Sequence, residues 1–138
     1  MTPDQVKQVQ SSFQQVVPLG ETVGELFYTR LFEIDPGLRR MFQNDMAEQG
    51  RKLLKMLAIA VQGLSRLDEL VPEVQALGRR HADYGVIPVQ YSTVGTALMW
   101  TLEKGLGRAF TPEIRNAWAA AYGLLSSTMI SAAKAKAA

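Results

Sequence analysis

The chain has 138 residues, of which 47% are hydrophobic, so it fits one domain, residues 1–138, with a substantial core. It contains no cysteine, which excludes a disulfide framework, a thiolate metal site and a cysteine nucleophile. Its 15 basic and 13 acidic residues leave a formal net charge of +2, an imbalance too weak to imply a nucleic-acid partner.

The N-terminus and the apolar stretches do not predict export or membrane insertion. Residues 1–5, Met-Thr-Pro-Asp-Gln, lack the basic and apolar character of a signal segment. The longest apolar stretches, such as residues 57–61, are far too short to span a bilayer. We therefore expect a soluble, cytoplasmic protein with no membrane partner.

Signals for the start of a helix open the chain and recur near its end. Residues 2–4 and 111–113 each place a threonine before a proline and an acid, a pattern that caps a first helical turn and suits its dipole. Four prolines divide the intervening sequence into segments of about 10 to 20 residues, the usual length of globular helices. These prolines are Pro18, Pro36, Pro72 and Pro88.

Three of these segments carry hydrophobic residues at helical spacing, whereas no segment shows a strand pattern. We expect the stretches 42–48 and 64–71 to be less regular, and the Ala/Lys-rich tail after about residue 131 to fray. The pattern predicts an all-α protein of about seven helices. The stripes are Phe27, Leu31 and Ile34, then Leu53, Leu57, Val61 and Leu64, and then Val94, Leu98, Leu102 and Leu106.

Two glycines predict a close helix crossing. Gly24 lies one turn before Tyr28, and Gly50 directly follows Gln49. A glycine on each helix lets two backbones approach closely. Such a crossing would bring Tyr28 and Gln49 together.

His81 is the one histidine of the chain, and it lies thirty-two residues after Gln49. A neutral imidazole is the usual protein ligand of haem iron, and the chain has no second histidine and no cysteine to replace it. If the chain binds a metal centre, we expect His81 to hold it. A single histidine on a helix is, however, more often structural or exposed.

Several motifs follow one another along the chain: Phe27-Tyr28 with Leu31-Phe32, the spacing from Pro36 to Phe42, the segment from Gln49 to Leu53, His81, the turn from Gly85 to Tyr91, and residues 117–123. In this order they resemble the single-domain bacterial globins related to the haem domain of flavohaemoglobins. The resemblance covers nearly the whole chain, from the first helix to about residue 130. It implies a globin fold, with helices sandwiching a pocket for haem b, iron protoporphyrin IX.

The resemblance also implies roles for individual residues. His81 would be the proximal iron ligand, with Tyr91 near it, and Phe42 would pack against the porphyrin. Leu77 and Val86 would also contact the haem, and Lys52 is placed to reach a propionate. The distal pocket would be formed by Tyr28, Gln49 and Leu53.

These residue types indicate a pocket for a gas. Bound dioxygen draws electron density toward its outer oxygen, so the Tyr28 hydroxyl and the Gln49 amide would stabilise it and slow its release, whereas carbon monoxide gains less. Leu53 would restrict the pocket and keep it dry, which strengthens such hydrogen bonds. Gln49 cannot ligate iron as a histidine could, so we expect an open distal position, or one held by water.

Each of these residues could instead have an ordinary structural role. Tyr28 could be a core tyrosine whose hydroxyl bonds a backbone carbonyl, and Gln49 a solvated surface residue. Phe42 and Leu53 would be core in almost any helical protein. The paired cations Arg39-Arg40, Arg51-Lys52 and Arg79-Arg80 most often form solvated faces.

The chain departs from the flavohaemoglobin pattern at its end. That family places a glutamate late in the last helix, where it joins the proximal tyrosine and histidine, but Ala133 stands at the corresponding position here. We therefore expect a weak proximal push. The sequence shows no glycine-rich nucleotide loop of a reductase, so we expect any turnover to draw electrons from a separate reductase.

Three functions remain open from the sequence. The first is reversible dioxygen binding for storage, delivery or scavenging, which needs only His81, Tyr28, Gln49 and an apolar pocket. The second is nitric oxide dioxygenase activity with an external electron donor. The third is a gas-sensing or interaction module, which could have lost the haem.

Overall fold

The computed structural model describes residues 1–42 and 45–137, and in this part of the chain it contains α- and 3₁₀-helices and no strand. The predicted all-α class is confirmed there. Six α-helices and three short 3₁₀-helices compare with the seven or so helices predicted. In order they are α1 (Pro3–Val16), η1 (Val17–Leu19), α2 (Gly20–Ile34), η2 (Pro36–Met41), α3 (Met46–Gly63), α4 (Leu67–Asp83), α5 (Pro88–Leu106), η3 (Gly107–Ala109) and α6 (Pro112–Ala137).

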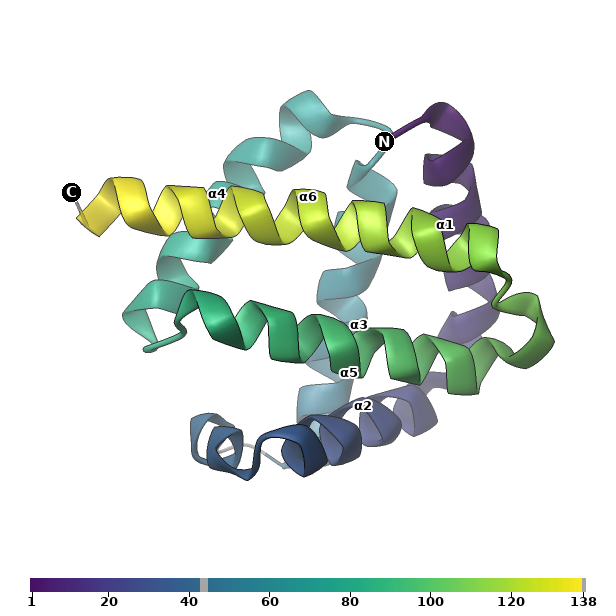
Figure 1. Cartoon of the computed structure of the whole chain (residues 1–138), viewed down its shortest axis with the longest axis horizontal. Coiled ribbons are helices and arrows are strands. Elements are labelled where there is room, and N and C mark those ends of the chain that lie inside the picture. The colour runs from purple at the N-terminus through teal and green to yellow at the C-terminus, as the bar shows by residue number, and fades with distance from the viewer. Residues whose placement is uncertain (43–44, 138) are drawn as a thin grey trace.

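The helices form crossed layers around one core (Figure 1). Helices α5 and α6 run side by side in opposite directions, and α3 crosses behind them with α1 and α4 on either side. Helix α4 packs mainly on α6, and α2 packs on both α3 and α5. Among the described residues, no helix has the combination of length and apolar character needed to cross a bilayer.

Both predicted helix starts are confirmed. The Thr2 hydroxyl accepts a hydrogen bond from the Gln5 backbone N–H at 3.1 Å, and the Gln5 side chain accepts one from the Thr2 N–H at 3.0 Å. At the start of α6, the Thr111 hydroxyl accepts from the Ile114 N–H at 3.2 Å. These side chains satisfy N–H groups that have no partner within the helix.

The prediction that Pro72 breaks a helix is wrong. The connection predicted to be loosely helical, residues 64–71, is non-helical at residues 64–66 and regular helix from Leu67, the first residue of α4. Pro72 lies in the second turn of α4 and removes one helical hydrogen bond. Leu70 and Val74, on either side of it, are buried, and their burial favours the continued helix.

Two further predicted segments lie partly outside the described residues. In the stretch predicted to be irregular, η2 ends at Met41 and α3 begins at Met46, so residues 46–48 are helical, while Gln43 and Asn44 are not described. The last helix extends to Ala137, and Ala138 is not described. The predicted fraying of the tail stays a prediction.

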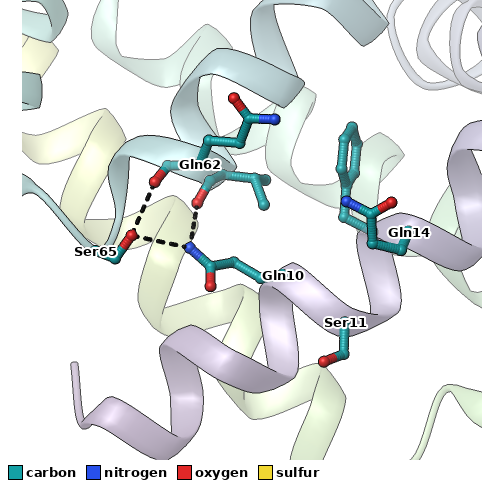
Figure 2. Close-up of a pocket in the computed structure, with 7 residues that line it drawn as sticks. Gln10, Ser11, Gln14, Gln62 and Ser65 are labelled. Carbon is teal, nitrogen blue, oxygen red and sulfur yellow. Dashed lines mark hydrogen bonds between the residues drawn. The ribbon is translucent and has the colours of Figure 1, made fainter.

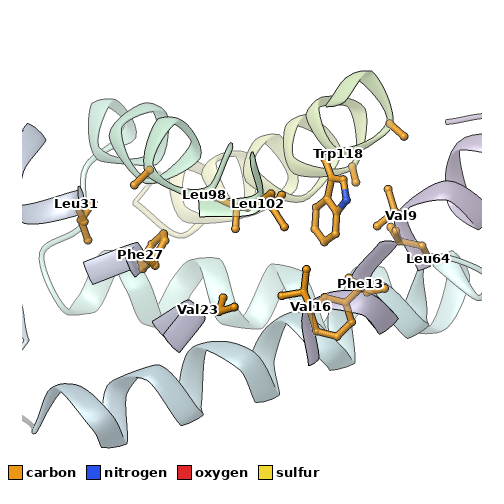
Figure 3. Packing of buried hydrophobic residues seen from close by; sticks show 14 of the residues in the cluster. Val9, Phe13, Val16, Val23, Phe27, Leu31, Leu64, Leu98, Leu102 and Trp118 are labelled. Carbon is orange, nitrogen blue, oxygen red and sulfur yellow. The ribbon is translucent and has the colours of Figure 1, made fainter. Parts of the chain in front are cut away.

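The core extends from α1 to the crossing of α2 and α5 (Figure 3). At one end Trp118 packs against Phe13 with their ring centroids 6.3 Å apart, and its indole N–H donates to the Ser12 hydroxyl at 2.8 Å. The predicted stripes are buried or half-buried, apart from Ile34, which is 38% exposed because it is the last residue of α2.

Candidate functional site

The predicted close crossing of two helices is present in the structure. A Cβ atom built on Gly24 of α2 would lie 2.6 Å from the Cα of Gly50 in α3, and one built on Gly50 would lie 3.1 Å from the Cα of Gly24, so the two backbones are in close contact. The crossing places the Tyr28 hydroxyl 3.5 Å from the backbone carbonyl oxygen of Gln49. At that distance the hydrogen bond is weak, so the hydroxyl is held only loosely.

Tyr28 is enclosed by aromatic rings. Its ring centroid lies 5.0 Å from that of Phe27, 6.0 Å from that of Phe32 and 5.2 Å from that of Phe42. Only 6% of Tyr28 is exposed, and this burial raises the pKa of its hydroxyl to about 12. The hydroxyl is therefore protonated at neutral pH and can act as a donor.

The three predicted residues of α3 differ in exposure. Gln49 is half-buried, and Leu53, one turn later, is partly buried against the core. Lys52 is exposed, and its Nζ lies 3.8 Å from Oε1 of Glu48 on the same helix. Since this exposed ion pair is weak, the Lys52 ammonium is available to another anion.

His81 is half-buried in the last turn of α4. Its Nδ1 lies 2.9 Å from the carbonyl oxygen of Leu77. Because a carbonyl can only accept, Nδ1 carries the proton, which leaves the lone pair on Nε2. Burial lowers the pKa of His81, the Leu77 bond opposes this effect, and the charge of Arg80 adds to it. The neutral imidazole is therefore favoured.

Tyr91 and Val86 lie close to His81. The Tyr91 and His81 ring centroids are 6.3 Å apart, with an angle of 28° between the ring planes. The backbone N–H of Val86 donates to the carbonyl of His81 at 3.0 Å, and the Val86 side chain is half-buried. Leu77 is partly buried against the core.

The predicted residues thus form two groups. We call Tyr28, Phe42, Gln49 and Leu53 the distal group, and Leu77, His81, Val86 and Tyr91 the proximal group; the haem contacts that these names imply stay predictions. Residues next to the two groups in the sequence are in contact, since the Gln90 amide nitrogen lies 3.8 Å from the Met41 sulfur. Gln90 precedes Tyr91, and Met41 precedes Phe42. The start of α5 therefore lies beside the end of η2.

The described residues contain no cluster of three or more His, Cys, Asp or Glu side chains that could hold a metal ion. A metal at this site would need most of its ligands from a cofactor. A porphyrin supplies four nitrogens and needs only one protein ligand, so the single imidazole of His81, with Nε2 as acceptor, fits that group.

A groove of about 360 Å³ lies elsewhere, between α1 and α3 (Figure 2). The Gln10 amide donates there to the Val61 carbonyl at 3.1 Å and lies 3.4 Å from the Ser65 hydroxyl. None of the predicted site residues lines it. Its lining is Gln10, Ser11, Phe13, Gln14, Val61, Gln62 and Ser65.

Residues 25–129 of the chain match the family model of the globins. The chain belongs to the globin family. This globin is 32% identical over 114 residues to a flavohemoprotein of Bacillus subtilis, covering 80% of this chain and 29% of the relative. It is 31% identical over 135 residues to a flavohemoprotein of Deinococcus radiodurans, covering 94% of this chain and 33% of the relative. The chain spans about a third of the length of these curated relatives.

Solved structures agree on the fold. A hexacoordinated heme protein from an anhydrobiotic tardigrade superposes with a TM-score of 0.86 at 17% identity, covering 97% of this globin and 96% of that chain. A bacterial globin from Campylobacter jejuni superposes with a TM-score of 0.81 at 22% identity, covering 96% of each chain. The predicted resemblance to bacterial globins and the predicted globin fold are confirmed.

Sequence reasoning did not assign roles to three residues near the proximal group. The Tyr122 hydroxyl donates to the carbonyl of Tyr91 at 2.6 Å. Cβ atoms built on Gly78 and Gly95 would collide with Met129 and Tyr122 of α6. Glycine inside a helix is a signal of close approach, and it could have indicated both contacts.

Proposed function

We propose that this globin binds dioxygen reversibly at a haem b held by His81. Membership of the globin family supports haem-based binding of a gas. The observation that carries the proposal is the His81 ring, whose Nδ1 is directed to the Leu77 carbonyl at 2.9 Å and whose Nε2 lone pair is left for iron. When bound, the haem supplies a ferrous iron with a coordination position for a diatomic gas.

The residues of the proximal group hold and orient the ligand. The Leu77 carbonyl fixes the tautomer of His81, and the Tyr91 ring limits rotation of the imidazole by stacking near it. Burial keeps the imidazole neutral, which is the form that can donate its lone pair.

The residues of the distal group select for a polar gas. The Tyr28 hydroxyl is protonated and only weakly bonded at 3.5 Å, so it can turn toward a ligand at little cost. We assign Gln49 the role of a second donor and Leu53 and Phe42 that of apolar walls, which exclude water and strengthen each hydrogen bond. Lys52 is our candidate for a haem propionate.

The first test is the absorption spectrum of the purified protein, as isolated and then reduced under air, beside a His81→Ala variant. We expect a sharp haem band, a stable spectrum that depends on dioxygen, and weak or altered haem binding in the variant. A protein that takes up no haem, even when haem is added, would overturn the proposal.

The second test is the dioxygen dissociation rate of Tyr28→Phe. Loss of one donor to a polar ligand costs roughly 1 to 3 kcal/mol, so release should accelerate about fivefold or more. Carbon monoxide release is the internal control and should change less. An unchanged dioxygen rate would remove Tyr28 from the distal group.

Nitric oxide dioxygenase activity is a second candidate, favoured by the likeness to flavohemoproteins at 31 to 32% identity. Nitric oxide, dioxygen and one electron give nitrate, so sustained turnover needs a reductant. Both functions predict rapid reaction with nitric oxide after dioxygen has bound. Sustained nitrate production with a cellular reductase would therefore distinguish the enzyme, and failure of any reductase to support it would exclude the second candidate.

A further inference from the structure

Tyr122 of α6 contacts α5 through its hydroxyl and through one edge of its ring. Its hydroxyl donates to the carbonyl of Tyr91 at 2.6 Å. Its ring lies in a notch at Gly95, where an added Cβ atom would be 2.7 Å from the ring carbon Cε2. Burial, with a smaller effect from Tyr91, raises the pKa of Tyr122, so the hydroxyl keeps its proton and stays a donor.

The residue that Tyr122 holds is the one that stacks near His81. Tyr91 lies in the first turn of α5, close to the turn that links α4 to α5. A backbone carbonyl can accept two hydrogen bonds, so the bond from Tyr122 adds to the helical one. Fixing the Tyr91 backbone restricts where its ring can lie relative to the imidazole 6.3 Å away.

The same helix α6 also holds the helix of His81. Gly78, three residues before His81, packs directly on the backbone of Met129, and a Cβ atom there would lie 2.5 Å from the Met129 Cα. Met129 follows Tyr122 by seven residues, two helical turns, so both lie on one side of α6. That side of α6 sets the position of α4 relative to α5.

We propose that Tyr122 is a positioning residue that acts through Tyr91 to set the orientation of the His81 imidazole. The inference rests on the proposed function, because the imidazole is taken to be the iron ligand. The restraint acts through the Tyr91 backbone and needs no acidic partner late in the last helix, where this chain has Ala133. Groups that orient a metal ligand influence both its affinity and the properties of the metal.

The test compares Tyr122→Phe with Tyr84→Phe. Tyr122→Phe keeps the ring in the Gly95 notch and removes only the hydroxyl, so the fold should survive. Tyr84→Phe is the matched control, since the Tyr84 ring centroid is 6.4 Å from that of His81, but Tyr84 is 71% exposed. Gly95→Ala is a second test, because its methyl group would displace the Tyr122 ring without deleting the hydroxyl.

Two readouts report on His81 itself. The first is the iron–histidine stretching band of the reduced, haem-loaded protein without a gas. The second is the NMR signal of the imidazole in the haem-free chain, which is unambiguous because the sequence has one histidine. We expect both to shift in Tyr122→Phe and in Gly95→Ala but not in Tyr84→Phe. Haem transfer to an acceptor protein should be about tenfold faster in Tyr122→Phe, the low end for groups that orient a ligand.

The outcomes separate this inference from the proposed function. If Tyr122→Phe lowers stability but neither His81 signal moves, Tyr122 is only structural and the inference fails. If the unmodified chain takes up no haem but the NMR signal still shifts in Tyr122→Phe, the proposed function fails and the positioning role stands.

Discussion

The α1–α6 end of the core and the distal group differ in how tightly their buried polar side chains are bonded. At the core end the Trp118 N–H bonds to Ser12 at 2.8 Å, and the Ser12 hydroxyl donates to the Gln8 carbonyl at 2.7 Å. In the distal group the buried Tyr28 hydroxyl has a weak contact of 3.5 Å with the Gln49 carbonyl.

This difference in bonding indicates that the core end contributes mainly to stability and the distal group mainly to binding. Short bonds between buried groups stabilise one conformation, whereas a weakly bonded donor can change partner when a ligand arrives. We therefore expect substitutions at the core end to change the free energy of unfolding, and those in the distal group to change mainly the gas affinity.

The largest effect on stability should come from Trp118→Ala. Removing this buried ring should lower the free energy of unfolding by about 3 to 5 kcal/mol. Trp100→Ala is the matched control, because Trp100 is half-buried with Arg30 and Lys104 over its ring and should cost less. Urea unfolding measures both variants. Equal decreases in the free energy of unfolding for the two variants would contradict the view that Trp118 at the α1–α6 end of the core is important for stability.

High pH should lower the stability of the folded chain through Tyr28 of the distal group. Its pKa is about 12 when folded and about 10 when unfolded, so between these values the folded chain holds a proton that the unfolded chain has lost. The contribution of Tyr28 is complete below pH 10 and declines as the pH rises to 12, by about 2 to 3 kcal/mol.

Urea unfolding of the haem-free protein at pH 9 and pH 12 tests this effect. Tyr28→Phe should lose less stability over this interval than the unmodified chain. Some loss should remain, because burial also raises the pKa of Tyr122. Identical declines in the two proteins would show that Tyr28 does not titrate as a buried group.

The Gly24–Gly50 crossing holds together α2 and α3, which carry Tyr28 and Gln49, so Gly24→Ala should affect both stability and binding. The new methyl group would force α2 and α3 apart, which should cost about 1 to 3 kcal/mol and alter dioxygen release. Gly123→Ala is the control, because nothing lies within 4 Å of its added Cβ. That variant should be about 0.5 to 1 kcal/mol more stable. Similar effects at both glycines would argue against a close crossing.

The smallest expected effect is that of Ser12→Ala, which leaves the Trp118 N–H buried without its partner. We expect a loss of about 1 to 2 kcal/mol, since the unpaired donor is uncharged. Ser127→Ala is the control, because Ser127 is exposed and bonds only to the Leu124 carbonyl of its own helix. Dioxygen release should be unchanged in both variants; a change in Ser12→Ala alone would show that the two regions are coupled.

The sequence predicted structural features correctly where their physical cause lies within a few residues of the chain. A threonine cap acts within one helical turn, so residues 2 and 111 marked the starts of α1 and α6 correctly. Glycines within helices predicted the crossing of α2 and α3. The proline rule is also local, but at Pro72 it failed, because burial of Leu70 and Val74 outweighed the loss of one hydrogen bond.

The sequence alone determined the helical class, the family and the identity of the sole imidazole. Tertiary structure decided which groups meet, because a bond such as that from Trp118 to Ser12 joins residues 106 positions apart. Likewise, only the packing of α6 on α4 and α5 shows that Tyr122 holds Tyr91 and that Met129 meets Gly78. Such contacts depend on the angles and offsets between packed helices, which no local pattern of residues specifies.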